Sequence, residues 1–410
     1  MRQALFLTIS LFCCTFTQAQ KVRTGIEVLQ ESKFKSLNGK RVGLITNPTG
    51  VNSQLKSTVD ILFDANNIEL IVLYGPEHGV RGDYSAGDKV EFFTDPKTKL
   101  PVYSLYGKNK KPSAQMLKGI DVLVYDIQDI GSRSYTYIST LGLAMEAAAE
   151  NNIKLMVLDR PNPLGGIKME GLVTEPEFIS FVSQFPIPYV HGLTVGELAE
   201  LLNGEKLLKN GAQCDLEVIK MNGWQRSMTF ENTELPWIPS SPHIPHANSS
   251  YFYPVSGILG ELYVYNIGVG YTLPFQLFAA EWINADSLAN KLNALKIEGI
   301  TFRPVHFKPY YSVSKGKMVH GVQVHFTNYQ EAPLSLIQFY ILQEAHALWP
   351  DHNVFELCTE SRISMFDKVC GSDKVRKVFT KNWQVADIEE MWYKDIEKFR
   401  NKAEKYFLYD

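Results

Sequence analysis

The sequence predicts an α/β protein: a Rossmann-like, doubly wound sheet followed by a smaller C-terminal α+β domain. Through the first half of the chain, short aliphatic and β-branched runs alternate with amphipathic helical segments, as they do in βαβ units. The runs are nearly unbroken in apolar residues, which is typical of parallel strands buried on both faces. A proline-rich segment at 235–256 then separates this part from one with a different order of elements.

The elements of the first domain follow from these patterns. Strands are expected over residues 41–46, 69–74, 101–106, 120–127, 154–158 and 215–221. Helices are expected over residues 57–66, 113–118, 138–152 and 195–208, where apolar residues recur at helical spacing. Thr194 and Glu197 form a capping-box pattern at the start of the last helix. The alternating run at 215–221 indicates an edge strand that closes the domain.

A Rossmann-like domain is therefore expected over residues 20–235 and a smaller second domain over 236–410. Four prolines before Tyr251 predict an extended crossover at the boundary. The aromatic and imidazole side chains of this crossover are candidates to line a cleft between the domains: Trp237, His243, Tyr251 and Tyr253. A rigid linker that these side chains hold in place is the alternative for each of them. Beyond it, helices are expected over 285–296 and 333–348, strands over 301–307 and 321–327, and an amphipathic surface helix over 385–406.

The first 19 residues have the pattern of a secretory signal peptide. Arg2 supplies a positive charge, residues 5–16 are apolar, and Thr17-Gln-Ala19 resembles a cleavage site. The mature protein is therefore expected in the periplasm or outside the cell. Cys13 and Cys14 also allow a lipid anchor, but Leu-Phe precedes them where small residues are usual, which favours cleavage without lipidation.

Composition excludes several classes of function. A net charge of −3 without a clustered basic stripe gives no footprint for nucleic acid. No later run is long and apolar enough for membrane insertion. Cys214, Cys358 and Cys370 lack the C-x-x-C spacing of a zinc site. Free buried thiols are favoured for them, although the sequence also allows a Cys358–Cys370 disulfide. Protein partners and oligomeric state stay open.

Polar loops follow three of the expected strands. They contain Glu77, His78 and Arg81 in the first loop, Asp126, Gln128, Asp129, Arg133 and Tyr135 in the second, and Asp159 and Arg160 in the third. Because the carboxyl ends of parallel strands meet at one edge of a sheet, these loops predict a shared cleft, whereas independent solvated loops would be the structural alternative. Asn47-Pro-Thr-Gly stands where a dinucleotide site would have G-x-G-x-x-G. No nucleotide or other cofactor is therefore expected.

The carboxylates of this cleft favour glycosidic chemistry. Cleavage of a glycosidic bond uses one carboxylic acid to protonate the leaving oxygen and a second group to attack or to activate water. The candidate carboxylates are Glu77, Asp126, Asp129, Asp159 and Glu170. No H-E-x-x-H or G-x-S-x-G pattern supports a metal or a serine mechanism instead. Tyr135, Tyr137, Tyr189 and Trp237 are candidates to stack on sugar rings, and Arg81, Arg133 and Arg160 to bind an acidic substituent.

Five blocks of the sequence resemble the NamZ-type exo-β-N-acetylmuramidases, a glycoside hydrolase family that was formerly a domain of unknown function. They are Gly43-Leu-Ile-Thr-Asn-Pro-Thr-Gly50, Gly75-Pro-Glu-His-Gly-Val-Arg-Gly82, Asp126-Ile-Gln-Asp-Ile-Gly-Ser-Arg-Ser-Tyr-Thr-Tyr137, Asp159-Arg-Pro-Asn-Pro-Leu-Gly-Gly166 and Trp237-Ile-Pro-Ser-Ser-Pro-His-Ile-Pro245. The resemblance covers nearly the whole mature chain. It implies release of terminal, non-reducing N-acetylmuramic acid from peptidoglycan fragments such as muropeptide disaccharides, in a cleft between a Rossmann-like and a smaller domain.

Site residues follow by carry-over from these blocks and from the loops around them. Glu77 is the first candidate for the catalytic carboxylate, with His78, Asp126 and Asp129 as further catalytic candidates. The candidates for substrate binding are Asn47, Arg81, Gln128, Arg133, Tyr135, Asp159, Arg160, Glu170, His191 and His243. The lactyl carboxylate of muramic acid would explain the arginines. No metal is expected.

Two departures from the family pattern leave the exact sugar preference open. His243 stands where the Pro-Ser-Pro block usually continues with Asn, and Gly268-Val-Gly-Tyr-Thr272 replaces a Gly-Arg-Gly-Thr-Thr stretch. The alternative function is a non-catalytic, exported protein that binds peptidoglycan fragments. Retention or inversion at the anomeric carbon depends on the separation of the carboxylates in space, so the second catalytic group also stays open.

Overall fold

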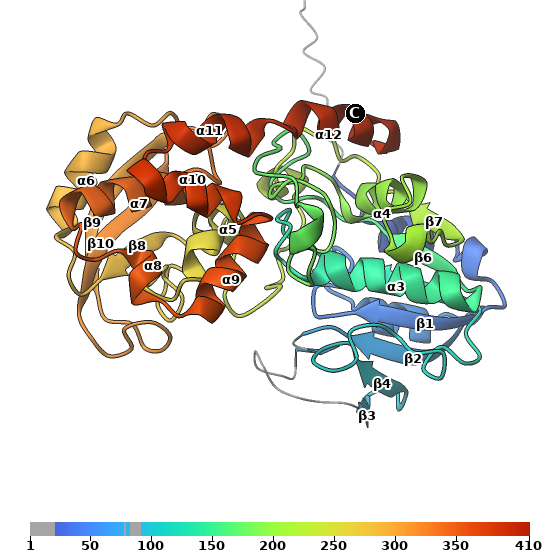
Figure 1. Ribbon diagram of the computed structural model, residues 1–410. Coiled ribbons are helices and arrows are strands. Elements are labelled where there is room, and N and C mark those ends of the chain that lie inside the picture. The colour runs from blue at the N-terminus through green and yellow to red at the C-terminus, as the bar shows by residue number, and fades with distance from the viewer. Residues whose placement is uncertain (1–20, 78, 83–91) are drawn as a thin grey trace, which may run out of the picture.

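The protein consists of two domains that lie side by side (Figure 1). The structure is a computed structural model, and it describes residues 21–77, 79–82 and 92–410. The predicted signal peptide and His78 lie outside these ranges. The first domain contains a seven-stranded sheet and the second a three-stranded antiparallel sheet. The predicted fold class, a Rossmann-like sheet followed by a smaller α+β domain, is confirmed.

The order of strands in the first sheet determines where a ligand can bind. The strands are β1 Arg41–Thr46, β2 Glu69–Gly75, β3 Phe92–Thr94, β4 Pro101–Ser104, β5 Val122–Asp126, β6 Lys154–Leu158 and β7 Leu216–Ile219, in the order β3-β4-β2-β1-β5-β6-β7. All neighbours pair in parallel except β3 with β4. After β4 the chain returns across the sheet to place β5 beside β1, so the topological switch point lies between β1 and β5. Ligands of such sheets bind outside the carboxyl ends of the strands at this point.

Helices cover both faces of this sheet. One face packs against α1 Gly25–Glu31 and α2 Thr58–Phe63, and the other against α3 Tyr137–Asn151 and α4 Val195–Gly204. Successive residues of β5 point to opposite faces of the sheet. Val124 therefore packs on the side of α1 and α2, and Tyr125 on the side of α3 and α4. Both faces are therefore buried, which explains why the strands are nearly continuous apolar runs.

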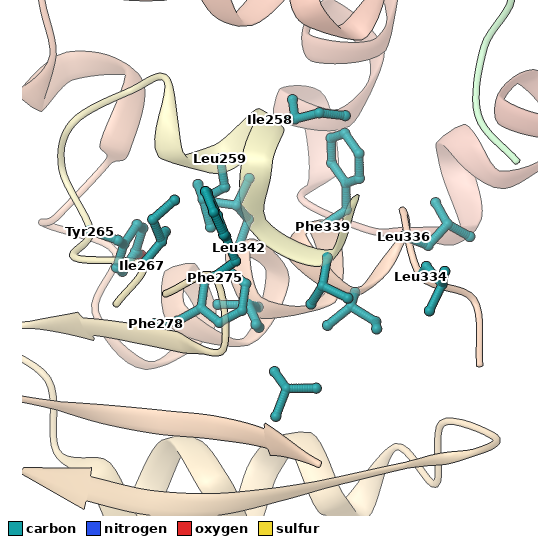
Figure 2. Packing of buried hydrophobic residues seen from close by; sticks show 14 of the residues in the cluster. Ile258, Leu259, Tyr265, Ile267, Phe275, Phe278, Leu334, Leu336, Phe339 and Leu342 are labelled. Atoms are coloured by element: carbon teal, nitrogen blue, oxygen red, sulfur yellow. The ribbon is translucent and has the colours of Figure 1, made fainter. Parts of the chain in front are cut away.

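The second domain contains most of the remaining helices. Its strands are β8 Leu277–Ala280, β9 Ile300–Phe307 and β10 Val319–Phe326, in the order β8-β10-β9. Its helices are α5 Ser249–Gly260, α6 Ala285–Ala294, α7 Ile337–Leu348, α8 Val354–Leu357, α9 Glu360–Cys370, α10 Lys374–Asn382 and α11 Ala386–Tyr393. Figure 2 shows part of its core, with Ile258 and Leu259 of α5 near Phe339 and Leu342 of α7.

The end of the chain returns to the first domain. Helix α12 Ile396–Ala403 follows α11, and Figure 1 shows α11 over the second domain and α12 over the first. Ile396 and Phe399 belong to the hydrophobic core beneath α3 and α4. The single amphipathic helix predicted over 385–406 is thus wrong in detail, because two helices meet between Tyr393 and Ile396 and bury their apolar sides in different domains.

Three other local predictions differ from the structure. Residues 114–119 form turns where a helix was predicted over 113–118, and Gly119 ends them with a φ of 86°, which is outside the helical range. Helix α4 ends at Gly204, before the predicted residue 208. Helix α5 begins at Ser249 within the segment predicted to be extended and contains Pro254. Burial of Val255 and Ile258 in the core of the second domain compensates for the hydrogen bond that this proline cannot make.

Short 3₁₀ helices complete the fold at Lys35–Leu37, Pro176–Phe178, Lys209–Gly211, Phe230–Thr233 and Glu404–Tyr406. The three cysteines of the described ranges are free thiols, with Cys214 and Cys370 buried and Cys358 half-buried, so the prediction of free thiols is confirmed. Of the helices that the structure describes, none combines the length and the apolar character needed to cross a bilayer.

Candidate active site

A pocket of about 220 Å³ lies between the two domains. The first domain contributes Glu77 after β2 and residues 134–137 after β5, while Tyr253 and Phe275 come from the second domain. Ser241 and His243 complete the lining. They belong to residues 235–248, the connecting segment between the two domains. Among the described residues that line it, Glu77 is the one carboxylate. The structure thus brings five of the predicted candidates together: Glu77, Tyr135, Tyr137, His243 and Tyr253.

The tight turn after β2 positions Glu77. Gly75 ends the strand, and a Cβ atom there would lie 3.0 Å from the Cα of Gly79 and from the nitrogen of Val80. Gly79 itself has a φ of 74°, a conformation that glycine adopts without strain. These glycines let the chain fold back directly at the strand end, where the carboxylate faces the second domain.

Tyr106 is a neighbour of Glu77 that the sequence did not identify. Its hydroxyl lies close enough to Glu77 to feel the charge of the carboxylate. Burial, together with the nearby charge of Glu77, raises the pKa of Tyr106 to about 12. Tyr106 is therefore protonated at neutral pH, so a neutral phenol lies beside the Glu77 carboxylate.

Aromatic rings form much of the pocket wall. The ring of Tyr135 meets those of Tyr137 and Tyr253 edge to face, at centroid distances of 5.0 and 5.6 Å. Tyr253 in turn packs against Phe275 at 4.9 Å. Such edge-to-face contacts fix ring orientation more precisely than apolar burial alone. The wall is therefore a rigid surface built by both domains.

Hydrogen bonds hold this wall to the connecting segment. The Tyr135 hydroxyl lies 2.8 Å from Ser240 Oγ, and the Tyr137 hydroxyl donates to the Ser240 carbonyl at 2.6 Å. Burial raises the pKa of Tyr135 to about 12, so its phenol stays neutral. His243 Nε2 lies 2.8 Å from the hydroxyl of Tyr311. The connecting segment is thus fixed on both sides of the pocket.

Arg133 directly precedes the pocket-lining residues 134–137 in the sequence, but its own side chain does not line the pocket. Its side chain is fully buried and donates to Ser183 Oγ at 3.1 Å and to the carbonyls of Leu172 and Ile187, each at 2.6 Å. Its second terminal nitrogen donates to the carbonyls of Val369 and Cys370, at 2.8 and 3.0 Å, at the end of α9. Arg133 therefore joins the two domains, and the structure leaves its guanidinium no free donor for a substrate.

Asp126 and Arg160 form a buried ion pair behind the strand ends. Arg160 Nε lies 2.5 Å from Asp126 Oδ1, and Nη2 lies 2.9 Å from Oδ2. Asp126 also accepts a hydrogen bond from the Thr58 hydroxyl, and Arg160 donates to the Val51 carbonyl. Neither side chain lines the Glu77 pocket. The pair instead holds the loops after β1, β5 and β6 together.

Asp159 and Glu170 also bind backbone and side-chain donors of the fold. Asp159 accepts from Thr194 Oγ1, Gly196 N and the Tyr409 hydroxyl at 2.7, 2.8 and 2.6 Å. Burial outweighs these bonds and raises the pKa of Asp159 to about 6. Glu170 accepts from Ser335 N and Oγ at 2.9 and 2.8 Å, which ties the first domain to the segment before α7.

Asp129, which lies in the loop after β5, and His191 are close to each other in the interior of the protein. His191 Nε2 lies 3.6 Å from Asp129 Oδ2, which also accepts from Gly131 N at 2.7 Å. Within the described ranges, neither Asp129 Oδ1 nor His191 Nε2 has a hydrogen-bond partner. The two residues are buried, and the structure does not bring them into the lining of the Glu77 pocket.

The remaining predicted residues stabilise loops. Arg81 binds Asp95 and Asp60, with Nε 2.5 Å from Asp95 Oδ1, and so anchors the Glu77 turn. Asn47 Oδ1 accepts from Thr49 N at 3.0 Å, and Gln128 Nε2 donates to Pro161 O at 2.7 Å. Gln128 lines a separate cavity of about 20 Å³ with Trp237. The predicted catalytic candidate His78 lies outside the described residues.

Sequence reasoning identified part of the pocket lining. Tyr253 was expected at the cleft and lies there, whereas Trp237 and Tyr251 do not line it. Ser134 and Ser241 sit beside residues that motifs had singled out, so proximity in sequence could have found them. Tyr106 and Phe275 carry no motif, and only the fold brings them to the site. Among the described residues, no group of three or more His, Cys, Asp or Glu side chains gathers as a metal site requires.

Comparisons with known proteins agree with this architecture. The model described as exo-β-N-acetylmuramidase NamZ, N-terminal, matches residues 42–248, and its C-terminal counterpart matches residues 251–409. The chain is 45% identical over 389 residues to the peptidoglycan β-N-acetylmuramidase NamZ of Bacillus subtilis strain 168, covering 95% of this chain and 92% of that protein.

Two solved structures of DUF1343 family proteins from Bacteroides fragilis NCTC 9343 are also similar. BF0371 is 58% identical with a TM-score of 0.92, and BF0379 is 30% identical with a TM-score of 0.76. Each match covers 95% of this chain and 99% of the other. The resemblance found in the five sequence blocks is thus confirmed, and the chain belongs to the exo-β-N-acetylmuramidase NamZ family.

Proposed function

We propose that this protein is an exo-acting glycoside hydrolase that releases terminal, non-reducing N-acetylmuramic acid from peptidoglycan fragments, with Glu77 as its catalytic carboxylate. The position of Glu77 carries the proposal. It is the one carboxylate among the described residues that line the interdomain pocket. Membership of the family and the 45% identity to a peptidoglycan β-N-acetylmuramidase support the substrate class.

The chemistry requires proton transfer at the glycosidic oxygen. A carboxylic acid protonates this oxygen as the bond to the anomeric carbon breaks, and a second group attacks or activates water. Glu77 provides the carboxyl group, and the neutral hydroxyl of Tyr106 lies near it. Asp126 does not supply the second group in this proposal, because Arg160 and Thr58 occupy its oxygens. The 2-acetamido group of the sugar can supply it, as in glycosidases with substrate-assisted catalysis.

The pocket wall suits a sugar ring. A pyranose has apolar C–H faces and polar edges, and the wall combines the rings of Tyr135, Tyr253 and Phe275 with the hydroxyls of Ser134 and Ser241. Ligand sites of this kind are mostly apolar, with a few placed polar groups that set orientation. Because Tyr135 and Tyr253 belong to different domains, the sugar would contact both.

Digestion of defined glycans tests the activity. We expect the purified protein to release free N-acetylmuramic acid from a disaccharide with this sugar at its non-reducing end, identified by mass. A longer glycan strand with N-acetylmuramic acid at its non-reducing end should lose this one terminal sugar and no internal sugar, because the enzyme is exo-acting. Binding of the disaccharide without any released monosaccharide would contradict the proposal and indicate a binding protein.

We also propose that the protein acts outside the cytoplasm, since peptidoglycan lies there. The pattern of residues 1–19 supports export. Expression of the full chain in a bacterial host, followed by cell fractionation and sequencing of the N-terminus, tests this. A mature N-terminus near Gln20 in the periplasm or medium is expected, and an unprocessed cytoplasmic chain would contradict it.

A further inference from the structure

A second pocket of about 220 Å³ adjoins the Glu77 pocket. The two share His243, Tyr253 and Phe275 in their lining. The second pocket continues along the end of α5 and the segment after it, where Glu261 and Tyr263 line it. A ligand that fills both pockets must pass these three shared residues. Two neighbouring pockets of equal volume suit a ligand made of two units of similar size, such as a disaccharide.

The second pocket combines aromatic surface with one carboxylate. Tyr253, Tyr263 and Tyr265 supply rings, and Glu261 is the one acidic side chain among the described residues of its lining. The Asn266 amide is not available to a ligand, because its Nδ2 donates to Val313 O at 2.8 Å and its Oδ1 accepts from Gly268 N at 2.8 Å. Glu261 is therefore the polar group best placed to accept hydrogen bonds from a ligand.

Glu261 is only weakly paired within the protein. Its Oε2 lies 3.9 Å from Nη1 of Arg362, beyond hydrogen-bond distance. The Arg362 guanidinium instead stacks on the ring of Tyr263, 3.6 Å from its centroid. Burial outweighs the attraction of Arg362 and raises the pKa of Glu261. A half-buried carboxylate in this state gains from hydroxyl donors, because they replace the hydration it has lost.

The charge of Glu261 also selects between the two sugars of the substrate. N-acetylmuramic acid carries a lactyl carboxylate, which the Glu261 carboxylate would repel at short range. A neutral amino sugar carries hydroxyls and no charge. We propose that the second pocket binds the neutral sugar on the leaving side of the scissile bond, and that Glu261 accepts hydrogen bonds from its hydroxyls. This inference rests on the proposed function and deepens it, since it assigns the leaving-group subsite and its specificity.

Two substrates distinguish this subsite from the Glu77 pocket. A disaccharide of N-acetylmuramic acid linked to N-acetylglucosamine fills both pockets, whereas N-acetylmuramyl fluoride has a leaving group of one atom and needs only the Glu77 pocket. Glu261→Ala should lower kcat/KM for the disaccharide by about tenfold, as expected for a lost hydrogen bond to a charged group. Its kcat/KM for the fluoride should equal that of the wild type.

Two further variants test whether the effect of Glu261→Ala is specific to the second pocket. Tyr263→Ala alters the exposed rim of the same pocket and should show the same selective loss. Glu298→Ala, which removes an exposed glutamate of the same domain, should leave both rates unchanged. Fluoride hydrolysis by the Glu261 variant also reports that it is folded. Equal losses on both substrates, or no loss with the disaccharide, would overturn the assignment. Failure of the wild type on both substrates would instead refute the proposed function.

Discussion

Arg133 provides the sharpest test of how the two domains are held around the pocket. Arg133→Met keeps an unbranched apolar side chain but removes the buried guanidinium, which donates three hydrogen bonds within the first domain and two to the end of α9. At about 1 kcal/mol for each net bond, the gross loss is roughly 5 kcal/mol. The positive charge no longer has to be desolvated, which offsets part of this loss, so a net destabilisation of about 3 kcal/mol is expected.

Urea unfolding followed by circular dichroism measures this loss directly. Arg133→Lys should also destabilise the protein, because one ammonium cannot reproduce the planar, five-donor geometry. Arg41→Met is a matched control, since it removes an arginine whose partner Asp121 lies at the exposed edge of the first domain, and its effect should be small. An Arg133→Met protein with the stability of the wild type would refute the view that this residue joins the domains.

Three further predictions concern residues behind the pocket. Asp126→Asn should cost about 3–5 kcal/mol in unfolding free energy, because it leaves the buried Arg160 unpaired, while the folded fraction stays active; loss of activity with unchanged stability would indicate a catalytic role. The raised pKa of Asp159, about 6, means that the folded state holds a proton that the unfolded state releases near pH 4. Wild-type stability relative to Asp159→Asn should therefore fall by up to about 3 kcal/mol between pH 4 and 6 and then level off, and an offset independent of pH would contradict this. Tyr409→Phe removes a 2.6 Å hydrogen bond to Asp159, so it should destabilise the protein by about 2 kcal/mol at pH 7 and raise the Asp159 pKa further, as nuclear magnetic resonance can measure.

Local sequence patterns predicted the first domain well because the same alternation of apolar strands and amphipathic helices repeats along the chain. The central parallel strands β1, β2, β5 and β6 are buried on both faces, so they appear as apolar runs in the sequence. The three-residue β3 is too short to show such a pattern. Helix α5 was not predicted, because Pro254 disfavours a helix locally. Packing against the core of the second domain nevertheless stabilises this helix. Tertiary contacts therefore determine whether this segment is helical, and a prediction from local sequence does not include them.

The site shows a related limit. Motif blocks correctly indicated the edge of the sheet, but they could not separate residues that face the pocket from those that build it. Arg81, Arg133 and Arg160 lie in these blocks, yet each is bound to groups of the protein itself. Their partners include Asp95 and the carbonyl of Val369, which are distant in sequence. Only the three-dimensional arrangement reveals that these guanidiniums are already occupied.

The most direct test of the central claim compares wild type with Glu77→Gln on the disaccharide, with released N-acetylmuramic acid measured by mass. The amide keeps the shape of Glu77 but cannot transfer a proton, so kcat should fall by roughly 10²–10⁴-fold while the unfolding midpoint is unchanged. Glu69→Gln, an exposed glutamate at the start of the same strand, should keep full activity. Full activity of a folded Glu77→Gln protein would contradict the assignment of Glu77 as the catalytic carboxylate.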